Sequence, residues 1–383
     1  MLVIEYRAIQ LDNLLNEMAK EVQLDQTRYD RMISSYEAIQ SLIEADEEFF
    51  KPYNYEVYPH GSVRIFTTVK PIGKDEFDLD IVLHFKNDNI VHSPSKIYAE
   101  LKRVLESHKT YDKMLEPKSR VLRLNYAGDF HMDIMTGIQA NVYDENKIKV
   151  PDRKLGKWVS SNPRGYADWF IDKSNLVELS LLEKTLKAEK IGADNFDNKK
   201  PLQRAVQLIK RYRDIYFEKN TTVYKEYKTR SIILTTIAGQ LYQGEESIFN
   251  TIDNIITKIY TQFSLPRRIK VFNPVNSEED FTDKWDTEPN YYYAFKNFVS
   301  HLYSEWQKLK RENGLIEENN IFKGLFGDKL VERVHLRENE IIEKMRNDND
   351  LGIIRDTGII SNTVISKNEP IMKNTFYGDE ENK

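Results

Sequence analysis

Two aspartates one residue apart, Asp78 and Asp80, are the side chains whose types and spacing most directly suggest chemistry. In residues 77–85 apolar side chains alternate with these acids, which is typical of a half-buried β-strand. Both carboxylates therefore point to the same side of the strand, where they repel each other unless a cation or a shared proton lies between them. Mg²⁺ takes one or two protein carboxylates and completes its shell with water and phosphate oxygens. The pair therefore predicts a nucleotide-metal site.

A Gly-Ser pair, Gly61 and Ser62, precedes the two aspartates in the chain. Glycine lets backbone N–H groups approach a phosphate closely, and the serine hydroxyl adds a hydrogen-bond donor. The apolar residues Val63 and Ile65 predict a short helix or strand whose start faces the ligand. Alone, an Asp-x-Asp strand is more often a solvated face, and a Gly-Ser pair is more often a turn. Their combination in this order favours a phosphate and metal site.

A third carboxylate lies on a strand further along the chain. Residues 121–126 and 130–135 both alternate in polarity, and a turn at Gly128-Asp129 between them predicts a hairpin. Asp133 lies on the polar face of the second strand, well placed to pair with the strand of the first two acids. Three strand carboxylates that converge on one point form the arrangement that two-metal phosphoryl transfer needs.

Composition limits the class of protein. With 383 residues, the chain is long enough for two lobes that each bury a core. The absence of cysteine excludes disulfides, thiolate zinc sites and cysteine nucleophiles, and it fits a reducing compartment. The sequence shows no secretory leader pattern and no apolar run of membrane length. We therefore expect a cytoplasmic protein without a membrane partner.

Charge bears on the kind of substrate. The formal net charge of −5 argues against a surface dedicated to long nucleic acid, because such proteins usually carry a basic face. Local basic clusters remain, and they suit a small anionic substrate better than a polymer. They comprise Lys199, Lys200, Arg204, Lys210, Arg211 and Arg213, and then Lys225, Lys228 and Arg230.

Helical periodicity predicts the elements around these residues. Apolar residues recur at helical spacing through residues 11–50, in two runs separated near Asp25, and a long helix there would back the sheet. A second helix is predicted near residues 95–108. Pro201 suits the first turn of a third helix, whose polar stripe carries Lys210. That lysine can reach toward a cleft, although a solvated helix lysine is the ordinary alternative.

Two further stretches lie at Ser231 and beyond Met345. Ser231 opens the apolar run SIILTTIAG, which predicts a buried helix and also makes the serine a plausible N-cap. Beyond about Met345 the pattern fades. The tail is rich in Asn, Asp, Ser and Lys, without a sustained helical period, and we expect it to be flexible or laid along the surface.

These motifs together resemble a known family. The Gly-Ser pair, the segment DEFDLDIVL and the segment FHMDIM resemble the core of DNA polymerase β-like nucleotidyltransferases. They resemble more closely the CD-NTases, the cGAS/DncV-like nucleotidyltransferases of bacterial CBASS anti-phage defence. The segments SNPRGYADWF (161–170) and PLQRAVQLIKRYRDIYF (201–217) are similar to stretches typical of bacterial CD-NTases. The resemblance covers roughly residues 25–290.

The resemblance implies an α+β fold with two lobes of polymerase β-like architecture. Residues 1–160 are then the nucleotidyltransferase catalytic core, a mixed sheet with helices that includes the long N-terminal helix. Residues 161–345 form a helical lobe that closes over the nucleotide, and residues 346–383 form a polar C-terminal tail.

The resemblance also assigns roles to the residues that match its motifs. Asp78 and Asp80 would bind metal, and Asp133 would bind the ion that lowers the pKa of the acceptor hydroxyl. Gly61 and Ser62 would hold the terminal phosphates of the donor nucleotide.

Two residues of the helical lobe match family positions less completely. Lys210 and Ser231 resemble the lysine and serine that reach those phosphates from the helical lobe in the cyclic GMP–AMP synthase branch. Ile232 replaces an aromatic residue found at the next position of the animal enzyme, so the residue that stacks on the base stays unassigned.

The activity implied is condensation of NTPs, ATP among them, into a cyclic di- or trinucleotide with release of pyrophosphate. Two Mg²⁺ ions, with Mn²⁺ as a substitute, would support it. The implied partners are an effector protein that responds to the product, and an accessory regulator or a C-terminal conjugation enzyme. Two alternatives stay open: a linear oligonucleotide synthetase or terminal nucleotide-adding enzyme, and an inactive nucleotide-binding regulator.

Overall fold

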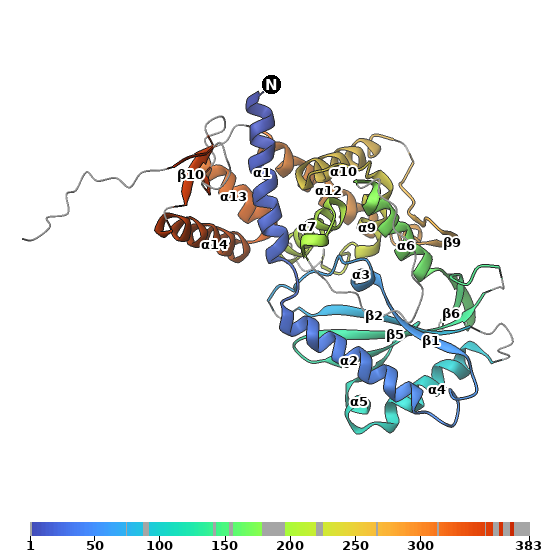
Figure 1. Cartoon of the computed structure of the whole chain (residues 1–383). Coiled ribbons are helices and arrows are strands. Elements are labelled where there is room, and N and C mark those ends of the chain that lie inside the picture. The colour runs from blue at the N-terminus through green and yellow to red at the C-terminus, as the bar shows by residue number, and fades with distance from the viewer. Residues whose placement is uncertain are drawn as a thin grey trace, which may run out of the picture.

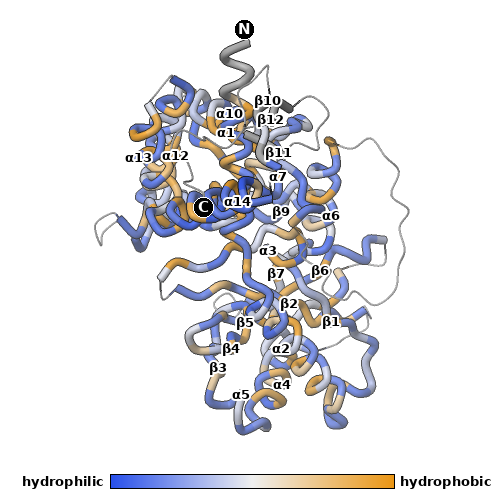
Figure 2. The backbone as a smooth tube through the Cα atoms, turned by 60° about the vertical axis from the view of Figure 1, so that its left-hand side comes forward, coloured by the Kyte–Doolittle hydropathy of each residue, from blue (hydrophilic) through white to orange (hydrophobic). Residues whose placement is uncertain are grey.

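The structure is a computed structural model with a sheet part and a helical part stacked one above the other (Figure 1, Figure 2). It describes residues 2–73, 75–86, 92–140, 143–152, 156–177, 196–219, 225–265, 267–311, 314–348, 350–354, 360–362 and 368–370. No helix within these ranges combines the length and the apolar character needed to cross a membrane.

The sheet part contains a mixed seven-stranded sheet among the described residues, with the strand order β1-β2-β5-β4-β3 and with β6 and β7 extending from β5. Among the neighbouring strands of this sheet, β2 and β5 run parallel and all other pairs run antiparallel. The parallel pair lies at the centre of the sheet. The strands are β1 (Tyr55–His60), β2 (Phe77–Phe85), β3 (Leu115–Pro117), β4 (Val121–Tyr126), β5 (Phe130–Gln139), β6 (Ile148–Asp152) and β7 (Lys157–Ser161). The predicted strand at 77–85 and the predicted β4–β5 hairpin are both confirmed.

One face of this sheet is covered by helices, as Figure 1 shows. The residues of β2 that alternate with the aspartates pack with α2 (Gln26–Glu44) and α4 (Pro94–Ser107) into one core, while α5 (Lys109–Met114) lies beside β4. Asp25 caps α2, since its carboxylate accepts a bond of 3.0 Å from the N–H of Arg28. The aspartates are thereby left on the opposite face of the sheet.

The helical part has its own core. Its helices are α1 (Leu2–Glu21), α6 (Pro163–Ser174), α7 (Pro201–Lys219), α9 (Ser231–Leu241), α10 (Ile248–Gln262), α11 (Lys284–Thr287), α12 (Asn290–Leu309), α13 (Leu315–Phe326) and α14 (Asp328–Asn347). Single turns of 3₁₀-helix lie at Asn175–Val177 and Phe196–Asn198, and a two-stranded ribbon joins β8 (Phe272–Asn273) and β9 (Asn276–Asp280). Helix α7 lies at the centre, because it contacts α1, α9, α10, α12 and α13.

The N-terminal helix departs from the sequence prediction. The two predicted runs form two separate helices, because the chain turns between the end of α1 at Glu21 and the cap at Asp25. Of these two helices, only α2 backs the sheet. The apolar stripe of α1, which includes Leu15 and Met18, instead packs in the helical core against α7, α10 and α14. An amphipathic stripe shows that a helix has a buried face but does not show which neighbour buries it.

The predicted tail is partly structured. Helix α14 runs to Asn347, and β10 (Leu351–Ile354), β11 (Ile360–Asn362) and β12 (Asn368–Pro370) form a small antiparallel sheet with β10 in the centre. β10 contacts α14. The other positions of the tail lie outside the described residues, and the domain boundaries remain predictions.

The placement of α1 can be tested by stability. Leu15 is fully buried and Ile9, on the same helix, is half exposed. We expect Leu15→Ala to lower the free energy of unfolding by about 2–5 kcal/mol, because it leaves a cavity in the helical core. The control Ile9→Ala should change it by less than about 0.5 kcal/mol. Equal effects of the two substitutions in urea unfolding would contradict this packing.

Candidate functional site

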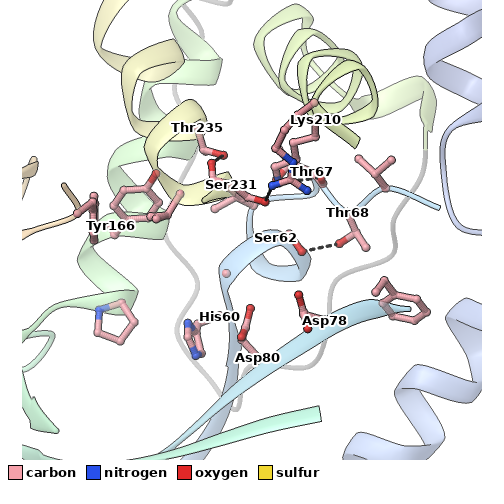
Figure 3. Close-up of a pocket in the computed structure, with 18 of the residues that line it drawn as sticks. His60, Ser62, Thr67, Thr68, Asp78, Asp80, Tyr166, Lys210, Ser231 and Thr235 are labelled. Atoms are coloured by element: carbon pink, nitrogen blue, oxygen red, sulfur yellow. Dashed lines mark hydrogen bonds between the residues drawn. The ribbon is translucent and has the colours of Figure 1, made fainter. Parts of the chain in front are cut away.

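A cavity of about 460 Å³ lies between the sheet part and the helical part. Its lower wall comes from β1, β2 and α3 (Gly61–Arg64), and its upper wall comes from α6, α7 and α9 (Figure 3). Six of the seven predicted site residues line it. They come from distant parts of the sequence, with Lys210 and Ser231 facing Asp78 and Asp80 (Figure 3). The lining set from the prediction is Gly61, Ser62, Asp78, Asp80, Lys210 and Ser231, with Asp133 outside it.

Asp80 and Asp133 lie with His60 in one row of the sheet, across three strands. In the strand register His60 of β1 is opposite Asp80 of β2, and Asp80 is opposite Asp133 of β5. Asp78 lies two residues earlier on β2, on the same side as Asp80, and both point toward Ser62 in Figure 3. The predicted convergence of three strand carboxylates therefore holds for the backbone positions.

The surroundings of Asp80 disfavour its negative charge. Burial raises the pKa of Asp80 well above its usual value, and the carboxylates of Asp78 and Asp133 raise it further. Burial in the cavity also raises the pKa of Asp78, although the Arg123 guanidinium opposes that shift. Burial lowers the pKa of His60 to about 4, so this imidazole is neutral at pH 7 and adds no positive charge. A cation bound between the two carboxylates would relieve their repulsion.

The side chain of Asp133 is engaged by an arginine from the next strand. Arg123 donates two hydrogen bonds of 2.7 Å to the two carboxylate oxygens of Asp133, and its Nη2 lies 3.5 Å from Oδ1 of Asp78. Within the ranges that the structure describes, no three His, Asp or Glu side chains are arranged as a ready metal-binding group. The pair Asp78 and Asp80 by itself fits Mg²⁺, which commonly binds one or two protein carboxylates plus substrate oxygens.

Gly61 is required by the close approach of α3 to Asp80. Its φ of +60° favours glycine, and a Cβ at this position would lie 2.3 Å from Oδ2 of Asp80. The predicted short helix begins at this glycine, so the backbone can turn directly above the carboxylate. Ser62 follows, and its Oγ accepts a hydrogen bond of 3.2 Å from Oγ1 of Thr68 (Figure 3).

Lys210 reaches the cavity from α7 as predicted, but it is buried rather than solvated. Its Nζ donates to the carbonyl oxygen of Thr67 at 3.1 Å and to Oγ1 of Thr67 at 2.9 Å. Burial, together with the nearby Arg213 cation, lowers the pKa of Lys210 to about 7. The lysine is therefore held at the cavity wall by neutral oxygen atoms.

Ser231 is the first residue of α9, and it is not the N-cap, a position that Arg230 occupies. Its Oγ accepts a hydrogen bond from Arg213. Arg213 also contacts Asp214 at 2.6 Å, and Nζ of Lys228 lies 2.9 Å from the same carboxylate. Two cationic side chains thus stand beside the predicted phosphate ligands.

The sequence predicted no role in the site for several of these lining residues. Arg213 and Lys228 belong to the two basic clusters, and Thr67 and Thr68 lie in no motif of the sequence. Arg213 lies three positions after Lys210 on one helix, and residues three apart share a face, which is the signal that could have found it. The two threonines carried no comparable signal, because a turn in the chain brings them to Ser62.

Aromatic and polar side chains of α6, β9 and the residues beside them also line the cavity. Tyr166 of α6 meets Phe281 edge to face with ring centres 6.0 Å apart. Glu279 of β9 accepts bonds from Asn273 at 2.7 Å and from Ser161 at 3.3 Å, and burial raises its pKa. Rings beside hydrogen-bonding groups suit a heterocyclic base.

The cavity therefore has two electrostatic sides. Asp78 and Asp80 lie on the sheet side, while Lys210 and Arg213 lie on the helical side. A divalent cation fits the first side, and a polyphosphate fits between that cation and the second. This arrangement can hold a nucleoside triphosphate and its metal for phosphoryl transfer.

The sequence matches a known domain family and, over nearly its whole length, a known protein. Residues 9–174 match the Second Messenger Oligonucleotide or Dinucleotide Synthetase domain. A c-di-GMP synthase of Roseivirga ehrenbergii is 43% identical over 383 residues, which span 99% of this chain and 100% of that protein.

Solved structures show the same fold. The Bradyrhizobium diazoefficiens CD-NTase CdnG in complex with GTP superposes with a TM-score of 0.69 at 21% identity, covering 86% of this chain and 98% of the other. The complex of CdnC with HORMA-deltaN from E. coli MS115-1 superposes with a TM-score of 0.58 at 11% identity, covering 82% and 96%. The predicted α+β, polymerase β-like fold is confirmed. The chain belongs to the CD-NTase family and is a nucleotidyltransferase of the kind that makes cyclic oligonucleotides.

Proposed function

We propose that this enzyme condenses NTPs into a cyclic dinucleotide second messenger for anti-phage signalling, with release of pyrophosphate. One observation carries the proposal: two strand carboxylates face a lysine and an arginine across a single nucleotide-sized cavity. The full-length relative named c-di-GMP synthase supports GTP as a substrate. That ATP is also a substrate, and that the product is a trinucleotide, stay open as predictions of the sequence.

The proposed metal ligands are Asp78 and Asp80, joined by Asp133. Two Mg²⁺ ions, or Mn²⁺ in their place, would lower the pKa of the acceptor ribose hydroxyl and neutralise charge on the triphosphate. The raised pKa values of the first two acids support this assignment, since a bound cation is what would favour their ionised forms. Each oxygen of Asp133 accepts one bond from Arg123 and keeps a second lone pair, with which it would bind the metal.

The proposed phosphate ligands are Gly61, Ser62, Lys210 and Ser231. The backbone at Gly61 approaches the acids closely, so a phosphate held there would lie next to the proposed metal position. Lys210 would exchange the oxygens of Thr67 for phosphate oxygens, which are stronger partners for an ammonium group. Arg213 would add a second cation through its position at Ser231.

The proposed partners act outside the catalytic cavity. An effector protein would respond to the product, and an accessory regulator or a C-terminal conjugation enzyme would control activity. The CdnC complex with HORMA-deltaN, a structure of this fold, supports a protein regulator. The cytoplasm is the location we propose for these encounters.

The product decides between this function and the linear alternative. The purified protein is incubated with Mg²⁺ or Mn²⁺ and all four NTPs, one labelled at the α-phosphate, and the products are treated with phosphatase and analysed by mass spectrometry. A phosphatase-resistant product is expected, and its mass gives the bases and the ring size. Phosphatase-sensitive ladders would instead indicate linear synthesis.

Removing the proposed metal ligands should abolish that product. We expect Asp78→Asn and Asp80→Asn each to reduce the rate by at least about 100-fold, because each removes a charge that holds the metal. Asp253→Asn on α10 is the matched control. Its carboxylate lies 3.0 Å from Nζ of Lys310, and neither residue lines the cavity. Wild-type rates in both cavity variants would refute the assignment.

The pKa of Lys210 predicts a pH dependence of nucleotide binding. The free enzyme carries the ammonium form below pH 7 and loses it above, because the pKa is lowered to about 7. Between pH 7.5 and 9 the Kd of a non-hydrolysable NTP should therefore rise by about tenfold per pH unit, with proton uptake on binding. Calorimetry in buffers of different ionisation enthalpy measures both. Lys210→Met should bind more weakly with a flat profile, and an unchanged slope in that variant would contradict the role.

A further inference from the structure

The segment after α3 folds back over Ser62. Phe66 has a φ of 57°, which is rare for a residue with a side chain and marks a tight change of direction. The N–H of Thr67 then donates to the carbonyl oxygen of Ser62 at 2.9 Å. Thr68 comes next, and its buried side chain lies beside the Ser62 hydroxyl.

Two side chains of helix α7 donate hydrogen bonds to backbone carbonyl oxygens of this segment. The amide Nε2 of Gln203 donates to the carbonyl of Ile65 at 3.1 Å. The amide Nε2 of Gln207 donates to the carbonyl of Thr68 at 2.8 Å. Both glutamines are buried, so water competes little for these bonds. The position of Thr68 therefore depends on a helix of the other part of the molecule.

The direction of the bond between the two hydroxyls has a chemical consequence. Oγ1 of Thr68 donates to Oγ of Ser62 at 3.2 Å (Figure 3). A hydroxyl has one proton and two lone pairs. Because Ser62 accepts here, its own proton is free to be donated, and Ser62 lines the cavity next to Asp78 and Asp80.

We propose that Thr68, held in place by Gln207, is a positioning residue that orients the Ser62 hydroxyl to donate to the terminal phosphates of the donor nucleotide. This inference rests on the proposed function. It assigns Thr68 no contact with the substrate. Helix α7 would then have two roles: it contributes Lys210, and through Gln207 it positions the residue that orients Ser62.

The test compares two ligands that differ only in their phosphates. Binding of a non-hydrolysable GTP analogue and of GMP is measured by calorimetry for the wild type, Thr68→Val and Thr68→Ser. Thr68→Val keeps the shape and removes the donor, so the GTP analogue should bind about three- to tenfold more weakly, as expected for one neutral hydrogen bond. GMP should bind unchanged. Thr68→Ser keeps the hydroxyl and should bind both like the wild type.

Two further variants sharpen the result. In a Ser62→Ala background Thr68→Val should cause no further loss of affinity, because the hydroxyl that it orients is gone. Gln207→Met should reproduce the loss for the GTP analogue. Tyr98→Phe is the matched control, since its hydroxyl donates to the carbonyl of Lys118 at 3.0 Å in the sheet part, away from the cavity. It should alter thermal stability but neither affinity.

The outcomes separate this inference from the proposed function. A Thr68→Val protein that binds the GTP analogue like the wild type, while the wild type makes cyclic product, overturns the inference alone. Equal weakening of GTP analogue and GMP also overturns it, since that result indicates general damage to the cavity. A wild type that neither binds the analogue nor makes cyclic product overturns both.

Discussion

The electrostatic problem at Asp80 is the constraint on which the rest of the site depends. This carboxylate is buried beside Asp78 and faces Asp133 across a strand pair, so its charge is unfavourable without a cation. The fold builds around it: a glycine at position 61 is the residue that lets α3 begin directly above its oxygen. A divalent cation bound here would relieve this repulsion, and its charge would in turn attract an anionic substrate.

Helix α7 connects this site with the helical part. Its polar side chains donate to the segment that follows α3, and one of them, Lys210, is also a proposed phosphate ligand. The same helix lies at the centre of the helical core and contacts α1 and α10. The position of the segment that follows Gly61 and Ser62 is therefore tied to that of α7 by hydrogen bonds.

The sequence predicted the parts of the site that follow from periodicity. Alternation along β2 located Asp78 and Asp80 on one face, and alternation along β5 put Asp133 on the polar face of a strand that pairs with β2, where it lies opposite Asp80. Arg123 was not predicted as the partner of Asp133, because cross-strand ion pairs depend on register. Gln203 and Gln207 lie on the same helix as Lys210, and a sequence pattern does not distinguish water from backbone carbonyls as the partner of such polar residues. The packing of α1 against the helical part was not predicted for a similar reason, because an apolar stripe on a helix does not indicate which element packs against it.

The metal assignment is tested most directly by a crystal structure with a non-hydrolysable GTP analogue and Mn²⁺, whose anomalous scattering locates the ions. We expect an anomalous peak between the carboxylates of Asp78 and Asp80, with the terminal phosphates against Ser62 and Lys210. A nucleotide bound in the cavity without a metal peak at those carboxylates, or with its phosphates directed toward Tyr166, would contradict it.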